Sequence, residues 1–93
     1  MNPFWDHPNS GFNLRGGVRN KAYIRFCELL IEARQNAGLT QRDLAQKLDR
    51  PQSFVSKYER RERRLDVVEF FEIARAIGFD PIRFLKTFDK ENP

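Results

Sequence analysis

Apolar side chains recur every three or four residues in three segments of the chain, which is the spacing of a helix with one buried face. The first segment covers 21–37 and stops at Gly38, and the second covers 67–77 between Asp66, a good N-cap, and Gly78. The third follows Asp80-Pro81, a cap and a proline of the kind that open a helix. The apolar positions are Tyr23, Phe26, Cys27, Leu30, Ala33 and Ala37 in the first segment, Val67, Phe70, Phe71, Ala74 and Ile77 in the second, and Ile82, Leu85 and Phe88 in the third.

Two shorter helices are predicted between the first and second segments. Thr40 and Asp43 have the spacing of a capping box, which opens a helix over about 41–48. Asp49-Arg50-Pro51 then interrupts the pattern, because a residue before proline avoids the helical region while proline itself suits a first helical turn. A further helix is therefore predicted over about 51–60.

The chain is predicted to form one compact all-α domain of five helices over 21–90, preceded by an arm. Residues 1–20 combine Asn, Pro, Gly and Ser with isolated aromatic residues and show neither a helical nor a strand period. We interpret them as a flexible N-terminal arm. No strand pattern and no internal repeat is found in the sequence.

Composition excludes several classes of protein. The sequence of 93 residues has no apolar run near the roughly 18 residues that cross a bilayer, and residues 1–10 lack the features of a secretory signal, so a cytoplasmic protein is expected. Cys27 lies among apolar positions and is interpreted as a core residue. His7 is the only histidine and stands in the arm, so no metal site is expected. Without a phosphate loop or a nucleophile motif, neither an enzyme nor a cofactor is predicted.

The net charge of +4 is concentrated in one part of the chain. Residues 50–64 contain six basic and two acidic side chains, so this window alone carries the whole excess of +4. The basic members are Arg50, Lys57, Arg60, Arg61, Arg63 and Arg64. A local basic patch of this kind indicates an anionic partner.

The helix over 51–60 is predicted to have one polar face that suits DNA. At 100° per residue, five side chains fall within an arc of roughly 140°, and these are Gln52, Ser53, Ser56, Lys57 and Arg60. The opposite arc consists of Phe54, Val55 and Tyr58. Amides can bond adenine, lysine reaches guanine acceptors, and hydroxyls serve a base or a phosphate. In the preceding helix, the small Ala45 permits a close crossing with the helix over 51–60. Thr40 and Gln41 stand at its N-terminus, where backbone amides and the Gln41 side chain can bind a phosphate.

The segment 21–88 resembles the Xre, or Cro/cI-type, family of helix-turn-helix proteins, which includes the lambdoid phage repressors. The residues that carry the resemblance are Arg34, Gly38-Leu39-Thr40-Gln41, Leu44-Ala45, Gln52-Ser53, Val55-Ser56, Tyr58-Glu59 and the run from Ile73 to Gly78. The resemblance implies a lambda-repressor-like domain that binds double-stranded DNA as a small transcriptional regulator, more specifically a repressor, in the cytoplasm and associated with the nucleoid.

The resemblance also implies roles for individual residues, because Gln41 matches a phosphate contact and Gln52, Ser53 and Lys57 match positions that face the groove. With the polar face of the helix over 51–60, the expected base contacts are Gln52, Ser53, Ser56 and Lys57. With the helix N-terminus and the basic window, the expected phosphate contacts are Thr40, Gln41, Arg50, Arg60, Arg61, Arg63 and Arg64. Arg34 and Glu59 match a partly buried structural pair. One departure concerns Arg61, which stands where many relatives have glycine. A left-handed conformation there would cost arginine about 1 kcal/mol.

Partners other than DNA follow from the ends of the chain. A symmetric homodimer is expected, with Phe84 as the outward apolar residue of the last helix and recognition helices about 34 Å apart. In the arm, three readings are open for Phe4, Trp5 and Phe12, which are docking on a protein partner, folding back over the core, and disorder. Arg15 and Arg19, also in the arm, suit the minor groove of the DNA itself. The alternative function is that of an antitoxin, which neutralises a partner protein and regulates its own operon.

Overall fold

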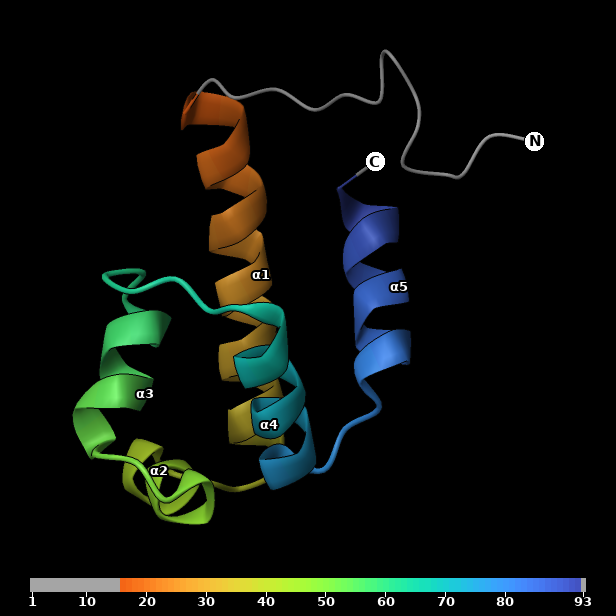
Figure 1. The fold of residues 1–93 in the computed structure, drawn as a ribbon. Coiled ribbons are helices and arrows are strands. Elements are labelled where there is room, and N and C mark those ends of the chain that lie inside the picture. Colours follow the sequence, from red (N-terminus) through yellow and green to blue (C-terminus); the bar gives the residue numbers. More distant parts are fainter. Residues whose placement is uncertain (1–15, 93) are drawn as a thin grey trace.

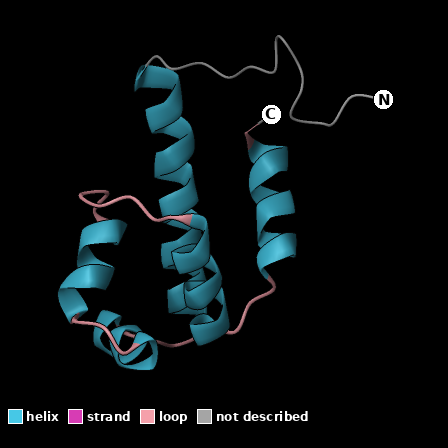
Figure 2. Cartoon of the chain, in the orientation of Figure 1, coloured by secondary structure: helices cyan, strands magenta, loops and turns pink. Residues whose placement is uncertain are grey.

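Five helices and no strand make up the part of the chain that the structure, a computed structural model, describes, which is residues 16–92 (Figures 1 and 2). The helices are α1 (Gly16–Asn36), α2 (Gln41–Leu48), α3 (Gln52–Glu59), α4 (Val67–Ile77) and α5 (Pro81–Glu91). In Figure 1, α3 and α5 lie on opposite sides of the long α1. The all-α prediction is confirmed, and α3 is one residue shorter at each end than predicted.

The predicted start of the first helix at Lys21 is wrong, because α1 begins at Gly16. The pair Gly16-Gly17 favours a break in the sequence pattern, but the structure continues the helix through it. Each glycine costs a helix only about 1 kcal/mol, and extension of a formed helix adds a backbone hydrogen bond per residue. Arg19 therefore belongs to a helix and not to an arm. The remaining arm residues, including Phe4, Trp5, His7, Phe12 and Arg15, lie outside the described residues.

Side chains cap the N-termini of α2, α4 and α5 where the sequence predicts. In α2 the Thr40 hydroxyl accepts from the Asp43 N–H at 3.0 Å, and the Asp43 carboxylate accepts from the Thr40 N–H at 2.9 Å. Asp66 forms the same reciprocal pair with Glu69 at α4. At α5 the Asp80 carboxylate accepts from two backbone N–H groups, and Pro81 follows it. Such caps satisfy donors that a helix leaves unpaired.

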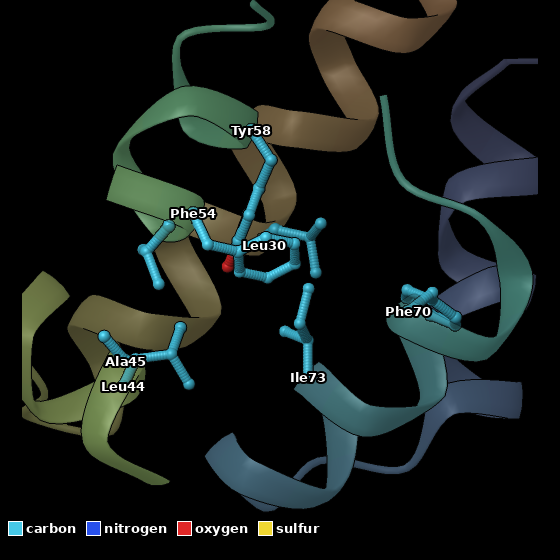
Figure 3. Packing of buried hydrophobic residues seen from close by; sticks show 8 residues of the cluster. Leu30, Leu44, Ala45, Phe54, Tyr58, Phe70 and Ile73 are labelled. Carbon is cyan, nitrogen blue, oxygen red and sulfur yellow. The ribbon is translucent and has the colours of Figure 1, made fainter. Parts of the chain in front are cut away.

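The core lies between α1, α2, α3 and α4 (Figure 3). Its buried members are Leu30, Leu44, Ala45, Phe54, Val55, Tyr58, Phe70 and Ile73. Cys27 is also fully buried, as predicted. Burial of each large side chain contributes about 1.5–3 kcal/mol.

The predicted orientation of α5 is wrong for Phe84, Ile82 and Leu85, whereas Phe88 lies inward as predicted. Phe84 packs inward, with ring centroids 5.7 Å from Phe26 and 5.3 Å from Phe70, and Phe88 lies 5.6 Å from Phe26. Ile82 and Leu85, predicted as core, are 52% and 37% exposed. Phe84 and Phe88 are four residues apart and share a face, whereas Ile82 lies about 160° from Phe84 and about 120° from Phe88 around the helix. The larger aromatic rings occupy the core, and the two aliphatic residues face outward.

None of the helices in residues 16–92 is long and apolar enough to cross a membrane.

Candidate nucleic-acid interface

The polar side chains predicted on α3 lie on its outer face. Gln52, Ser53 and Lys57 are exposed, as is Arg60 at the end of the helix, and Ser56 is half-buried. The Ser56 hydroxyl donates to the Ser53 carbonyl at 3.3 Å, which leaves its oxygen free to accept a hydrogen bond. The opposite face, with Phe54, Val55 and Tyr58, is buried. The sequence therefore predicted both faces of α3 correctly.

Glu59, at the end of α3, joins three segments through its carboxylate. Arg34 on α1 donates through Nε to one oxygen at 2.7 Å and through Nη2 to the other at 3.1 Å. Gln41, the first residue of α2, donates to the carboxylate through Nε2 at 2.8 Å. Arg34 also reaches the Leu39 carbonyl at 2.8 Å, just before α2. The Arg34 and Glu59 side chains are only 11% and 4% exposed, so this is a buried bidentate pair with a third partner.

The Glu59 contact fixes the amide orientation of Gln41. A carboxylate only accepts hydrogen bonds, so the group that faces Glu59 must be the NH₂. One N–H is used there, and the second remains available to an acceptor outside the protein. Sequence reasoning gave Gln41 a phosphate contact but missed its bond to Glu59, because that bond depends on how α2 crosses α3. Ala45, buried on α2, permits that close crossing.

The loop between α3 and α4 brings together three of the predicted phosphate-binding arginines. Arg60 pairs with Glu62 at 2.9 Å, and this ion pair lowers the pKa of the Glu62 carboxyl. Arg61 has a φ of 64°. This is the left-handed conformation that is expected to cost arginine about 1 kcal/mol. The Arg64 guanidinium stacks over the ring of Tyr23 at 4.3 Å from the centroid. All three arginines are exposed.

Arg50 and Arg63 are placed differently from the other predicted phosphate contacts. Arg63 donates to both oxygens of Glu69 at 2.9 and 2.6 Å, and Arg50 lies 3.5 Å from the same carboxylate and 3.3 Å from that of Glu72. The guanidinium carbon of Arg50 lies 4.4 Å from the ring centroid of Phe54, and that of Arg63 lies 4.8 Å from it. Both are within cation–π distance. Two arginines of the basic window are thus held against the buried side of α3.

Glu69, which binds two of the predicted phosphate-contacting arginines, was not identified from the sequence. Hydrogen bonds from Arg63, together with one from the Asp66 backbone, lower the pKa of Glu69 to about 2. A signal was present in the sequence, because Glu69 stands three residues after the N-cap Asp66, the spacing of a capping box. Its ion pairs were not visible, because Arg50 is distant in sequence.

The described residues contain no cluster of three or more histidine, cysteine or acidic side chains that suits a metal ion. Burial raises the pKa of the Cys27 thiol, which makes this cysteine unreactive.

Comparison with known proteins identifies the family. A helix-turn-helix family model matches residues 30–84, which include all of α2, α3 and α4. A solved structure of an XRE-family like protein from Pseudomonas syringae pv. tomato str. DC3000 is 50% identical, with a TM-score of 0.78. The match covers 82% of this chain and 93% of that one. No matching sequence is found among curated proteins. The chain therefore belongs to the XRE family of helix-turn-helix DNA-binding regulators.

Proposed function

We propose that the protein binds a specific duplex DNA sequence through α3 and represses transcription by occupying that site. The observation that carries the proposal is the outer face of α3, where an amide, hydroxyls and a cation stand on a helix anchored by the buried Arg34–Glu59 pair. Gln52, Ser53, Ser56 and Lys57 supply the base contacts in the major groove. The family match supports DNA binding and does not favour the antitoxin alternative.

Phosphate contacts fix α3 in the groove. Thr40 and Gln41 stand at the N-terminus of α2, where backbone N–H groups and the free N–H of the Gln41 amide favour an anion. In the loop, Arg60, Arg61 and Arg64 supply positive charge. Arg50 and Arg63 are assigned a supporting role, because their ion pairs with Glu69 hold them against Phe54.

A symmetric dimer completes the proposed function. Ile82 and Leu85 expose an apolar patch on α5, and a second copy is the occupant that suits a two-fold DNA site. The two α3 helices would then lie about 34 Å apart on a pseudo-palindrome, one turn of B-DNA. Such a regulator works in the cytoplasm, bound to the nucleoid.

The experiment is selection from a random duplex library by the purified chain, followed by titration of the selected sequence and of scrambled DNA at physiological salt. A palindromic motif bound at least about 10³-fold more tightly than scrambled DNA is expected. Weak binding of equal affinity for all sequences would contradict sequence-specific recognition.

Substitution then tests the recognition helix. Gln52→Ala is expected to lose about 1–3 kcal/mol of affinity for the selected site and to relax the preference at one or two base pairs. Gln35→Ala, which removes an exposed glutamine from α1, is the matched control and should bind as the parent does. If Gln52→Ala keeps the parent's affinity and base preference, α3 is not the reading element.

A further inference from the structure

An open groove of about 260 Å³ lies between the second half of α1 and the first half of α5. Leu29 and Ala33 line it from α1, Phe84 lines it from α5, and Phe79 lines it from the connection before α5. Most of the exposed lining is apolar. No residue of α3 or of the loop after it lines the groove, so the groove is separate from the proposed DNA-binding face.

The helix on one side of the groove, α5, is incompletely covered. None of its residues is buried, whereas α2, α3 and α4 each bury at least two. Phe84 and Phe88 hold it to α1 through contacts with the ring of Phe26. An ion pair of 2.6 Å between Arg25 and Glu91 is partly exposed and therefore contributes little. A segment that packs into the groove would bury apolar surface on both helices.

The segment before α1 is long enough to reach the groove. Residues 1–15 precede Gly16, the first residue of α1. At 1.5 Å per residue, the groove begins about 20 Å from Gly16 at Leu29 and ends about 30 Å from it. Trp5 is eleven residues before Gly16, so an extended chain carries it up to about 36–40 Å. Phe12 is four residues before Gly16 and reaches only about 14 Å, short of the groove.

We propose that the N-terminal segment folds back along α1 and docks Phe4 and Trp5 in the groove of the same chain. These two rings supply the large apolar surface that an apolar groove between helices takes. Charge complements this contact. Asp6 follows Trp5 directly, and Arg83, which also lines the groove, forms no ion pair within residues 16–92. The docked segment holds α5 against α1 and leaves α3 free, so this inference does not rest on the proposed function.

Trp5 is the only tryptophan of the chain, which makes the docking directly measurable. The experiment compares the quenching of tryptophan fluorescence by acrylamide in the full chain and in a synthetic peptide of residues 1–15. The quenching constant of the full chain is expected to be at least about threefold lower, because a ring packed in an apolar groove is shielded from the solvent. Equal quenching in the chain and the peptide would overturn the proposal.

Substitutions in the groove locate the contact. Ala33→Gln places a long polar side chain where the ring docks, and it should restore at least about half of the lost quenching. Ala37→Gln, at an exposed alanine that does not line the groove, is the matched control and should quench as the parent does. Arg83→Gln, a substitution on the exposed surface, should raise the quenching constant by less than about twofold. Protection of Trp5 that survives Ala33→Gln would place the ring elsewhere and overturn the proposal.

Dilution distinguishes docking in the same chain from docking on a second copy. Docking within the chain gives a quenching constant that is independent of protein concentration, because the segment is tethered to its own groove. A segment bound to a second copy is released on dilution by mass action. A quenching constant that rises on dilution towards that of the peptide would therefore overturn docking within the chain.

Hydrogen exchange of backbone amides tests whether the docked segment holds α5. The double variant Phe4→Ser with Trp5→Ser should raise the exchange rates in α5 at least about threefold, and leave those in α2 and α3 within about twofold of the parent. Phe12→Ser is the matched control, because Phe12 cannot reach the groove, and it should leave α5 unchanged. Exchange rates in α5 that are the same in the double variant and in the parent would overturn the proposed role of the segment.

Discussion

Glu59 is buried, with 5% of the residue exposed. Its carboxylate accepts three side-chain hydrogen bonds, two from Arg34 and one from Gln41. A buried charge costs several kcal/mol unless partners replace the lost water. All three donors come from α1 and α2, the two helices that precede α3 and contact it. The same residue therefore stabilises the fold and orients the N-terminus of α2, next to the proposed DNA contacts.

Removing one member of the Arg34–Glu59 pair is expected to destabilise the fold strongly. Arg34→Met leaves the Glu59 charge with Gln41 alone and should cost about 3–5 kcal/mol in the free energy of unfolding, measured by urea denaturation. The double variant with Glu59→Leu should recover much of that loss, because no charge then remains buried. A loss of stability in the double variant equal to the sum of the losses in the two single variants would argue against a coupled pair.

Tyr58 offers the opposite case. Its hydroxyl is buried, and no hydrogen-bond partner for it exists among the described residues. Burial is also the main cause that raises the pKa of its hydroxyl. Tyr58→Phe keeps the ring packed on Phe54 and removes the unpaired hydroxyl, so a stabilisation of about 1 kcal/mol is expected in the same urea measurement. A loss of stability would indicate that the hydroxyl has a partner.

At the scale of single residues, the sequence predicted which side chains lie on the outer face of α3, and the structure forms the Arg34–Glu59 ion pair that the resemblance implies. It did not predict the third partner of Glu59 or the ion pairs of Arg50 and Arg63 with Glu69. Pairing of long charged side chains depends on the distance between elements. That distance is set by packing and leaves no periodic trace in the sequence.

At the scale of elements, each of the four connections between helices has a residue of left-handed backbone as its first or second residue. These residues are Gly38, Asp49, Arg61 and Gly78, with φ of 74°, 56°, 64° and 99°. After α3 the Arg61 N–H reaches the Tyr58 carbonyl and the Glu62 N–H reaches the Lys57 carbonyl, the pattern of a Schellman motif. Glycine adopts this conformation without strain, whereas arginine does not.

Arg61→Gly is accordingly expected to stabilise the fold. Removal of the strain should raise the free energy of unfolding by about 1 kcal/mol, seen as a higher Tm. Arg60→Gly is the matched control, because Arg60 has a φ of −85° and gains nothing from glycine. An equal effect of both substitutions would show that relief of charge repulsion, and not backbone strain, is the cause.

The N-terminus of α4 gives the fold a dependence on acid pH. The pKa of Glu69 is lowered from 4.5 to about 2, chiefly by the hydrogen bonds from Arg63. Because the folded-state value is the lower one, ionised Glu69 stabilises the fold above about pH 4.5, and this contribution is lost as the pH falls from there towards 2.

Glu69→Gln tests this dependence. Glutamine still serves the capping box, so the variant should be less stable at pH 7 by on the order of 1–2 kcal/mol, with the difference shrinking below pH 4 in urea unfolding. Glu72→Gln is the control, since Glu72 is exposed and, among the described residues, forms an ion pair with Arg50 alone. A difference between Glu69→Gln and the parent that stays constant from pH 7 to pH 2 would contradict the assignment.

Helix ends were largely predictable, and the exceptions have physical causes. Caps and proline act within a few residues, so the starts of α2, α4 and α5 could be predicted from the sequence. The start of α1 was missed because a helix extends past glycine when the rest of it is already formed. The inward face of α5 was missed because aromatic and aliphatic positions compete for one core, and Phe84 contacts three other rings there.

At the scale of the whole molecule, the basic window divides into two parts. Arg50 and Arg63 both form ion pairs with Glu69, while Arg61 and Arg64 form no ion pair among the described residues and lie beside the end of α3. The sequence charge indicated an anionic partner, in agreement with the DNA-binding family, but it overstated how many cations are unpaired. Ion pairs within the fold decide that number.

The exposed patch on α5 leads to a prediction about assembly. If the proposed dimer forms through this patch, Ile82→Lys with Leu85→Lys should give a monomer at concentrations where the parent associates, as measured by analytical ultracentrifugation. Stability of the monomer should change by less than about 0.5 kcal/mol, because both side chains are exposed. Val67→Lys changes another exposed apolar residue and should leave the dimer intact. If the parent is itself a monomer at all accessible concentrations, the α5 interface is excluded.

The left-handed residues after α1, α2, α3 and α4 also bear on how fast the chain folds. The end of each of these helices is determined by a few adjacent residues. Its boundary is therefore defined before the helix packs against elements that are distant in the sequence. Connections this short keep the entropy of loop closure small. Refolding is therefore expected to be a single phase complete within about milliseconds, as for other helical domains of low contact order.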